Sequence, residues 1–124
     1  TNLCHNAVDR HLQTRGEQNA LIYISTETGQ QRSYTFNELH AEVNRCAAVL
    51  RSLGLGRGDR MLIYMPMVPE AVFAMLACVR LGAIHSVVFG GFASHSLALR
   101  TARHRRLCGG SRGVHEAHLL RQAG

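Results

Sequence analysis

Two adjacent glycines, Gly90 and Gly91, separate an apolar strand-like run from a helix-like run in the stretch VVFGGFAS (87–94). A turn of this kind lets backbone N–H groups approach a ligand, and the amino end of the following helix favours an anionic group. The same glycines also suit a tight strand-to-helix turn with no ligand. The residues alone favour that plainer interpretation, so the stretch by itself is a weak indication of a site.

The other residue types that do chemistry are scattered. The histidines His11, His40 and His85 have no carboxylate or thiol partner at catalytic spacing, which predicts surface or satisfied-core roles for them. Near the carboxyl end, a zinc-like set could be drawn from His104, Cys108, His115 and His118. Its spacing matches no common structural zinc site, and no G-x-S-x-G, paired-carboxylate or Cys/His nucleophile pattern is present. We therefore predict no catalytic and no metal-binding residue.

Composition and charge bound the class of protein. The chain has 124 residues, of which 46% are hydrophobic and 18% charged, as in an ordinary globular domain. All 14 basic residues are arginine, so no lysine of this chain can take part in a mechanism. Residues 1–101 carry nine arginines against seven acids, whereas residues 102–124 carry five against Glu116 alone. The main part of the chain gives no electrostatic reason to expect a nucleic-acid partner.

Cysteine usage and hydropathy predict a reduced compartment and no membrane span. The four cysteines are far apart in the sequence and form no C-x-x-C pair. Residues 1–16 lack the apolar core of a signal peptide, and the apolar stretch 61–92 is interrupted by prolines and charges. We expect a cytoplasmic protein, or a mitochondrial-matrix protein in a eukaryote.

Hydrophobic periodicity predicts helices that alternate with short strands. Apolar residues at helical spacing mark residues 2–14, and strands at 20–25 and 31–35 form a hairpin around the turn 26–30. Thr35 and Glu38 are placed as a capping box that opens a helix. Its apolar face comprises Phe36, Leu39, Val43, Cys46, Ala47, Leu50 and Leu53, and Gly54 ends it.

A second set of elements predicts a parallel sheet. A buried strand at 60–65 leads through Pro66 and Pro69 into an almost entirely apolar helix at 70–82, which Gly82 ends. A strand at 83–89 follows, with a further helix from Ser94. A strand–helix–strand order of this kind predicts an α/β fold.

The stretch YMPMVPEAVFAMLACVRLGAIHSVVFGGFAS (64–94) closely resembles the short-chain acyl-CoA synthetases of the adenylate-forming (AMP-binding) superfamily. The resemblance extends back through LRSLGLGRGDRMLIYMP, YTFNELHAEV and NAVDRH, and covers about residues 2–100. The segments NLCHNAVDRH and GGFAS look more like the propionyl-type branch than the acetyl-type branch. As a fold, the resemblance implies the opening portion of the large N-terminal domain, residues 1–101, with an incomplete sheet.

The resemblance also implies an activity and a site. A small carboxylate attacks ATP to give an acyl-adenylate and pyrophosphate, magnesium serves that step, and coenzyme A then takes the acyl group. Carried over position by position, Phe89, Gly90, Gly91 and Phe92 are the cofactor-binding candidates near the coenzyme A and acyl tunnel. The chain does not contain the family's phosphate loop, adenine-binding segments or catalytic lysine. The resemblance therefore implies that these 124 residues alone are inactive, bind none of these cofactors tightly and self-associate through uncovered strand edges.

The resemblance stops shortly after Arg100. The family continues with an Arg-Ile-Asp-Asp-like helix, whereas this chain reads TARHRRLCGGSRGVHEAHLLRQAG. The family's Ile-Asp-Asp can be encoded by ATC GAC GAC. Preceded by C and read one nucleotide early, these codons give His-Arg-Arg, the sequence found at 104–106. This match predicts that residues 102–124 are read out of frame or are otherwise replaced. Two alternatives remain. One is a non-catalytic module whose basic tail binds nucleic acid or an acidic partner, and the other is a truncated product with no activity.

Overall fold

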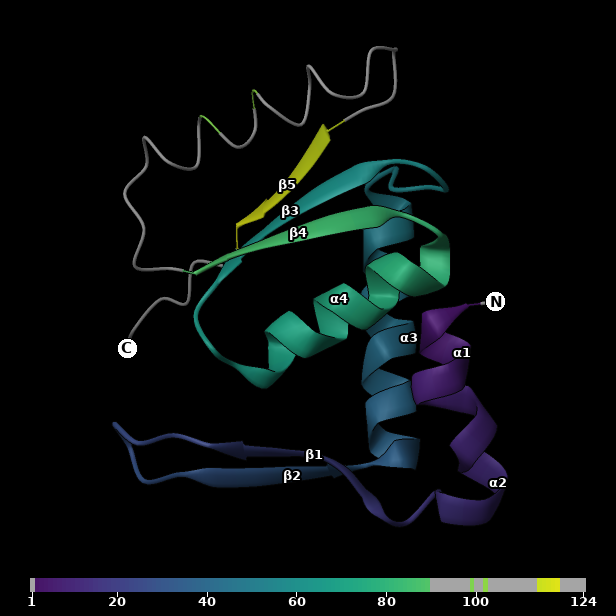
Figure 1. Cartoon of the computed structure of the whole chain (residues 1–124), viewed down its shortest axis with the longest axis vertical. Helices are drawn as coiled ribbons and strands as arrows, with labels where there is room; N and C mark the ends of the chain where they lie inside the picture. Colours follow the sequence, from purple (N-terminus) through teal and green to yellow (C-terminus); the bar gives the residue numbers. More distant parts are fainter. Residues whose placement is uncertain (1, 90–98, 100–101, 103–113, 119–124) are drawn as a thin grey trace.

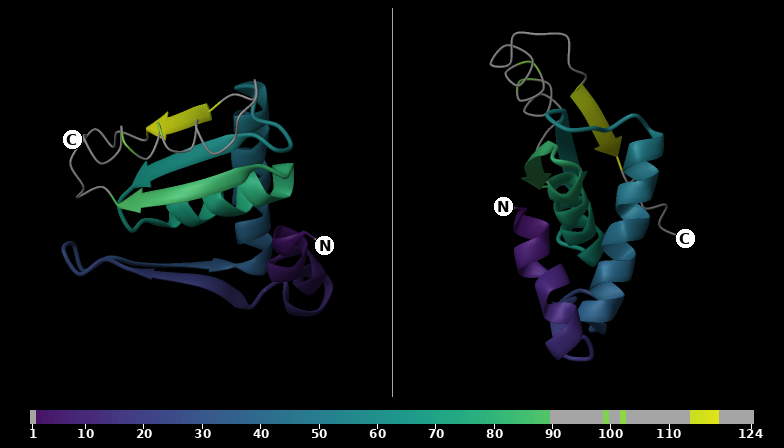
Figure 2. Two further views of the ribbon diagram at one scale, coloured as in Figure 1. Left: turned by 45° about the horizontal axis from the view of Figure 1, so that its top comes forward. Right: turned by 90° about the vertical axis from the view of Figure 1, so that its right-hand side faces the viewer.

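The computed structural model describes residues 2–89, 99, 102 and 114–118. Two helices, α3 (Phe36–Ser52) and α4 (Pro69–Leu81), pack against each other beneath a parallel sheet, and a two-stranded hairpin lies on the far side of the helices (Figures 1 and 2). The sheet has the strand order β4 (Ile84–Phe89), β3 (Arg60–Met65), β5 (Val114–His118), and the hairpin consists of β1 (Asn19–Ile24) and β2 (Gln31–Thr35). This mixed α/β arrangement, with two small sheets, confirms the predicted fold class and the incomplete sheet.

The hairpin forms where the sequence predicts it. Strands β1 (Asn19–Ile24) and β2 (Gln31–Thr35) are antiparallel, with Ile24 opposite Gln31 at the turn. The Ser25 N–H donates to the Gln30 carbonyl at 2.8 Å, and Gly29 has a φ of 67°, which glycine adopts without a Cβ clash. The turn therefore closes through the residues that the composition of segment 26–30 marks as turn formers.

Helix α3 (Phe36–Ser52) begins at the predicted capping box. The Glu38 N–H donates to Thr35 Oγ1 at 3.2 Å, and the Thr35 N–H donates to Glu38 Oε2 at 2.9 Å. Four residues of the predicted apolar face are buried: Leu39, Val43, Ala47 and Leu50. The prediction is wrong for Leu53, which is 69% exposed because the helix ends at Ser52 and the chain turns outward at Gly54, with a φ of 91°.

The central unit is strand–helix–strand, as predicted. Strands β3 (Arg60–Met65) and β4 (Ile84–Phe89) are parallel, in a register that runs from Arg60 opposite Ile84 to Met65 opposite Phe89. Helix α4 (Pro69–Leu81) connects them, and it stops at Gly82, which has a φ of 73°. The Gly58 N–H donates to the Gly82 carbonyl at 2.9 Å and ties the two amino ends together.

Two regions differ from the sequence prediction. The run predicted as helical at 2–14 is divided into α1 (Leu3–Ala7), a 3₁₀ turn η1 (Asp9–His11) and α2 (Leu12–Arg15), because the backbone leaves helical geometry at Val8. Strand β5 (Val114–His118) pairs in parallel with β3 although the sequence predicts no strand there. The helix predicted from Ser94 lies mostly outside the described residues.

One hydrophobic core joins the helices to the sheet. Its most deeply buried members come from α1 and its end, from α3, β3 and α4: Cys4, Val8, Val43, Ile63, Ala77 and Cys78. Within the described part of the chain, no helix has both the length and the apolar character needed to cross a membrane.

Removing the capping hydroxyl tests how far α3 depends on its first turn. We expect Thr35→Ala to lower the free energy of unfolding by about 1 kcal/mol, because the Glu38 N–H loses its acceptor. Thr35→Ser keeps the hydroxyl and should stay close to the original chain. Urea unfolding followed by circular dichroism measures both, and equal midpoints for the two variants would contradict this assignment.

Candidate functional site

One of the predicted site residues, Phe89, lies at the carboxyl edge of the parallel sheet. Strands β3 and β4 point the same way, and their last register pair is Met65 with Phe89 (Figure 1). In open α/β sheets, ligands bind in the crevice outside the carboxyl ends of the strands. The structure places the backbone of Phe89 at this edge. Gly90, Gly91 and Phe92 lie outside the described residues.

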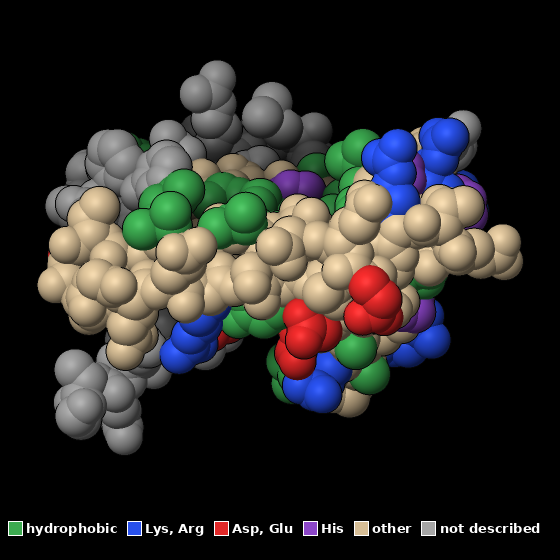
Figure 3. All heavy atoms as spheres, turned by 90° about the horizontal axis from the view of Figure 1, so that it is seen from below, with side chains coloured by type: hydrophobic (Ala, Val, Ile, Leu, Met, Phe, Trp, Pro, Cys, Tyr) green, Lys and Arg blue, Asp and Glu red, His purple; other side chains and the backbone are tan. Residues whose placement is uncertain are grey.

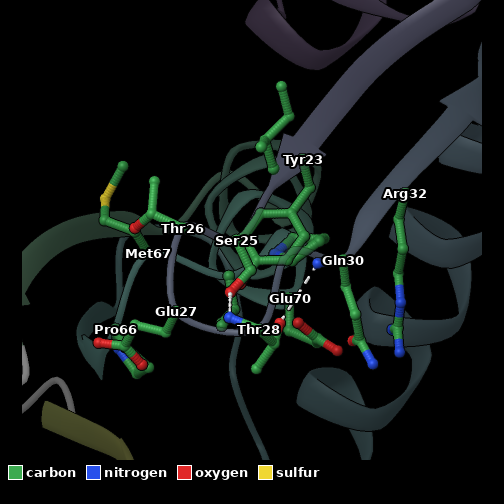
Figure 4. A pocket seen from close by; sticks show the side chains of 13 residues that line it. Tyr23, Ser25, Thr26, Glu27, Thr28, Gln30, Arg32, Pro66, Met67 and Glu70 are labelled. Atoms are coloured by element: carbon green, nitrogen blue, oxygen red, sulfur yellow. Dashed lines mark hydrogen bonds between the residues drawn. The ribbon is translucent and has the colours of Figure 1, made fainter.

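A pocket of about 310 Å³ lies beside this edge, between the hairpin turn and the loop that leads from β3 into α4. Figure 4 shows Tyr23 in its middle, with Pro66 and Met67 from the loop and Glu70 from the first turn of α4. The loop residue Pro66 directly follows the last residue of β3. The pocket therefore adjoins the carboxyl end of β3, the strand that pairs with β4.

The lining of this pocket combines apolar groups with groups that form hydrogen bonds. The latter include hydroxyls of the hairpin turn, one of which accepts the Thr28 N–H at Ser25 Oγ over 3.2 Å. The charged groups of the lining are the carboxylates of Glu27 and Glu70 and the guanidinium of Arg32. The hydroxyls, carboxylates and guanidinium of the lining offer hydrogen bonds to a ligand, and Pro66, Met67 and Val68 offer apolar contacts.

Sequence reasoning did not find this pocket. The sequence predicts only a turn at 26–30 and only the start of a helix at Pro66 and Pro69. No sequence motif indicates that the hairpin turn and the loop after β3, which are far apart in the sequence, face each other. The available signal was topological: the loop after the first strand of a parallel unit lies at the edge where such folds bind ligands.

A second group of polar side chains surrounds Arg80, the one charged residue of α4 beyond its first turn. Its Nη1 donates to Asn44 Oδ1 of α3 at 2.6 Å, and its Nη2 donates to Asp9 and, at 3.3 Å, to Cys4 Sγ. Burial by itself lowers the pKa of Arg80, but the hydrogen bonds to Cys4 and Asp9 outweigh it and raise the pKa. The guanidinium thus remains charged and joins α1, η1 and α3 to α4.

His40 belongs to the same group of polar side chains. Its Nε2 lies 3.5 Å from Asp9 Oδ1 and 3.1 Å from the Asn44 amide nitrogen. The sequence shows no carboxylate at catalytic spacing from His40, and packing supplies one, Asp9, from a distant segment. None of these residues lines the pocket, and their role is to hold elements together.

His11, His85, Cys46 and Cys78 are half-buried or buried. His11 lies against Phe36 with ring centroids 5.2 Å apart, and burial lowers the pKa of His85. Burial also raises the pKa of Cys46, and raises that of Cys78 to about 11. Among the described residues, no three His, Cys, Asp or Glu side chains are grouped to hold a metal ion. The tail set with His104 and Cys108 lies largely outside the described residues.

The face seen in Figure 3 carries acidic and basic side chains near one another, with hydrophobic side chains between them. This mixture follows from the near balance of nine arginines and seven acids in residues 1–101. Charges of both signs on one face do not create the single-sign field that attracts a polyanion.

Breaking the Arg80 group tests its structural role. We expect Arg80→Met to lower the free energy of unfolding by about 2 kcal/mol, because Asp9 and Asn44 lose a charged donor in a largely buried place. The matched control is Arg45→Met. Arg45 pairs with Glu42 at 2.7 Å on the exposed surface of α3, so its loss should cost under about 0.5 kcal/mol. Chemical denaturation measures both, and similar costs would refute the distinction.

The lowered pKa of His85 gives stability a defined pH dependence. The folded chain binds this proton more weakly than the unfolded chain, whose histidine has the ordinary pKa of 6.5. Stability from the neutral ring is therefore complete above that value and is lost as the pH falls through it. We expect the loss of unfolding free energy between pH 7.5 and 5.5 to be smaller in His85→Gln. An unchanged loss in denaturant titrations at the two pH values would contradict this.

Comparison with known proteins identifies the family of this chain. The family model of the AMP-binding enzyme matches residues 8–105. The propionate–CoA ligase of Escherichia coli K12 is 63% identical over 100 residues, which make up 81% of this chain and 16% of the ligase.

Acetyl-coenzyme A synthetases are also similar. That of Xanthobacter autotrophicus is 58% identical over 102 residues, 82% of this chain and 16% of that protein. That of Methylobacterium radiotolerans is 56% identical over 100 residues, 81% of this chain and 15% of that protein. The chain spans about a sixth of the length of the curated relatives it matches. From residue 8 to residue 105, the chain belongs to the family of AMP-binding enzymes.

Proposed function

We propose that residues 1–101 are the opening part of an ATP-dependent acid–thiol ligase that converts propionate, or acetate, to its coenzyme A thioester through an acyl-adenylate. The observation that carries the proposal is the 63% identity over 100 residues to a propionate–CoA ligase. The preference for propionate rests on the lower identity, 56–58%, to two acetyl-coenzyme A synthetases.

The role of this chain in that reaction is to form one wall of the site. Phe89 ends β4 at the carboxyl edge of the sheet, which supports a loop at Phe89–Phe92 that faces a ligand. Gly90 and Gly91 would allow close backbone approach to the thiol-bearing substrate, and the two phenylalanine rings would exclude water from the acyl transfer. Magnesium belongs to the ATP step of the longer enzyme, and we assign none of its ligands to this chain.

A chimaera tests the proposal. Residues 1–101 replace the matching segment of the Escherichia coli propionate–CoA ligase, and propionate-dependent pyrophosphate release is measured. We expect activity within about tenfold of the parent, since most of the exchanged positions are identical. Gly91→Val in the same chimaera should lower kcat/KM about a hundredfold, because a Cβ branch displaces the backbone from the substrate.

The 124-residue chain alone is the negative arm of this assay, and we expect no pyrophosphate release from it. A folded chimaera without activity would overturn the proposed function. Activity of the chain alone would overturn its assignment as an inactive part. Equal kcat/KM for the Gly91→Val and original chimaeras would overturn the assignment of the loop.

For the tail, residues 102–124, we propose a sequence that is out of frame or otherwise replaced from about His104 onward. The family match ends at residue 105, and the identity to the relatives covers 100 to 102 residues. The run HRR (104–106) equals the Ile-Asp-Asp codons of the family read one nucleotide early. Sequencing the encoding DNA from codon 100 onward should show an Ile-Asp-Asp continuation in an adjacent frame. Its absence from both adjacent frames would refute the proposal.

A further inference from the structure

The pocket between the hairpin turn and the loop after β3 has charged groups of opposite sign at its two ends. Figure 4 shows Glu27 at one end, and Gln30 and Arg32 at the other. Glu70 lies between these ends, on the side of Arg32, and the ring of Tyr23 lies in the middle. The volume of about 310 Å³ is within the range of sites for small molecules. A ligand that spans the pocket therefore meets a carboxylate at one end and a guanidinium at the other.

The charged groups of this pocket have no partner from the described part of the protein. Residues 2–89 contain seven carboxylates, of which five accept a hydrogen bond from another protein group: Asp9, Glu17, Glu38, Glu42 and Asp59. The other two are Glu27 and Glu70, both of which line the pocket, and neither forms a hydrogen bond or an ion pair with a described residue. Within the same residues, the guanidinium of Arg32 also lacks a partner. All three charges are therefore available to a ligand.

The middle of the pocket suits a short hydrocarbon chain. Its lining combines the half-buried ring of Tyr23 with Pro66 and Met67 of the loop. The methylene groups of long cationic side chains pack along surfaces of this kind while their charged ends reach polar groups. The turn that carries Glu27 is closed by the Ser25 N–H, which donates to the Gln30 carbonyl at 2.8 Å. The folded turn therefore sets the separation of the two charged ends before a ligand binds.

We propose that this pocket binds a free α-amino acid with a basic side chain, such as lysine. Its carboxylate would pair with the guanidinium of Arg32, its α-ammonium with Glu70, and its side-chain cation with Glu27. The two cations and one carboxylate of the ligand then match the two carboxylates and one cation of the lining. An acidic ligand would leave both carboxylates of the lining unpaired, and a diamine would bring a cation toward Arg32. This inference stands on the pocket and does not rest on the proposed ligase function.

Lysine and two of its analogues test the proposal on the 124-residue chain. Norleucine lacks the side-chain ammonium, and cadaverine lacks the carboxylate. Binding is followed by the backbone chemical shifts of residues 25–32 and 66–70 in nuclear magnetic resonance spectra. We expect lysine to bind with a Kd on the order of 1 mM, and each analogue to bind about threefold more weakly, since an ion pair between exposed groups contributes little.

Neutral variants assign the two ends of the pocket. Glu27→Gln should remove the preference for lysine over norleucine, because the side-chain ammonium loses its carboxylate. Arg32→Gln should remove the preference for lysine over cadaverine, because the ligand carboxylate loses its cation. The matched control is Glu42→Gln, which removes an equal charge from α3 outside the pocket and should keep both preferences. Circular dichroism checks that each variant is folded.

The outcomes separate a specific pocket from a general effect of charge. The proposal is wrong if lysine at tens of millimolar shifts none of these signals, or if it binds to the original chain no more tightly than either analogue. It is also wrong if the folded Glu27→Gln and Arg32→Gln variants keep both preferences, or if Glu42→Gln removes them. Should a variant unfold, the comparison of the three ligands on the original chain decides.

Discussion

The arrangement of the helices depends on the hydrogen bonds of the Arg80 guanidinium. A cation withdrawn from water is tolerated only where acceptors replace the lost hydration, and here three elements supply them: Cys4 of α1, Asp9 of η1 and Asn44 of α3. These contacts fix the carboxyl-terminal end of α4. The opposite end of the same helix, at Pro69 and Glu70, forms one wall of the pocket. The position of that wall therefore depends on polar contacts at the far end of the helix.

Most of the fold could be predicted because its signals are local. Thr35 and Glu38 are three residues apart and bond to each other, and Gly82 ends α4 in the left-handed conformation that glycine favours. The strand–helix–strand unit followed from apolar runs of the right length. Local patterns did not reveal the break at Val8 or the outward turn at Leu53, because packing decides both. Strand β5 was unpredictable from its residues, since VHEAH has neither the alternation nor the apolar content of a strand.

The candidate site, like the fold, could be predicted from the sequence only in part. The loop at residues 89–92 stays a prediction from the family resemblance, and the structure shows where strand β4, which leads into it, ends. The pocket was not found, because Tyr23 and Pro66 become neighbours only when the hairpin folds across the helices. The contact of His40 with Asp9 was missed for the same reason: it joins α3 to a separate turn near the amino terminus. Only the isolated charge of Arg80 in an apolar helix indicated that polar partners existed.

The core cluster that joins the helices to the sheet is drawn entirely from residues 4–83. Chains are made from the amino end, and domains begin to fold as they emerge from the ribosome. This cluster can assemble once β4 has left the exit tunnel, while residues of the divergent tail are still inside the tunnel. The tail therefore meets a surface that is already ordered. A different sequence beyond residue 100 would change the strand that pairs with β3, and it would not prevent the helices from packing against one another.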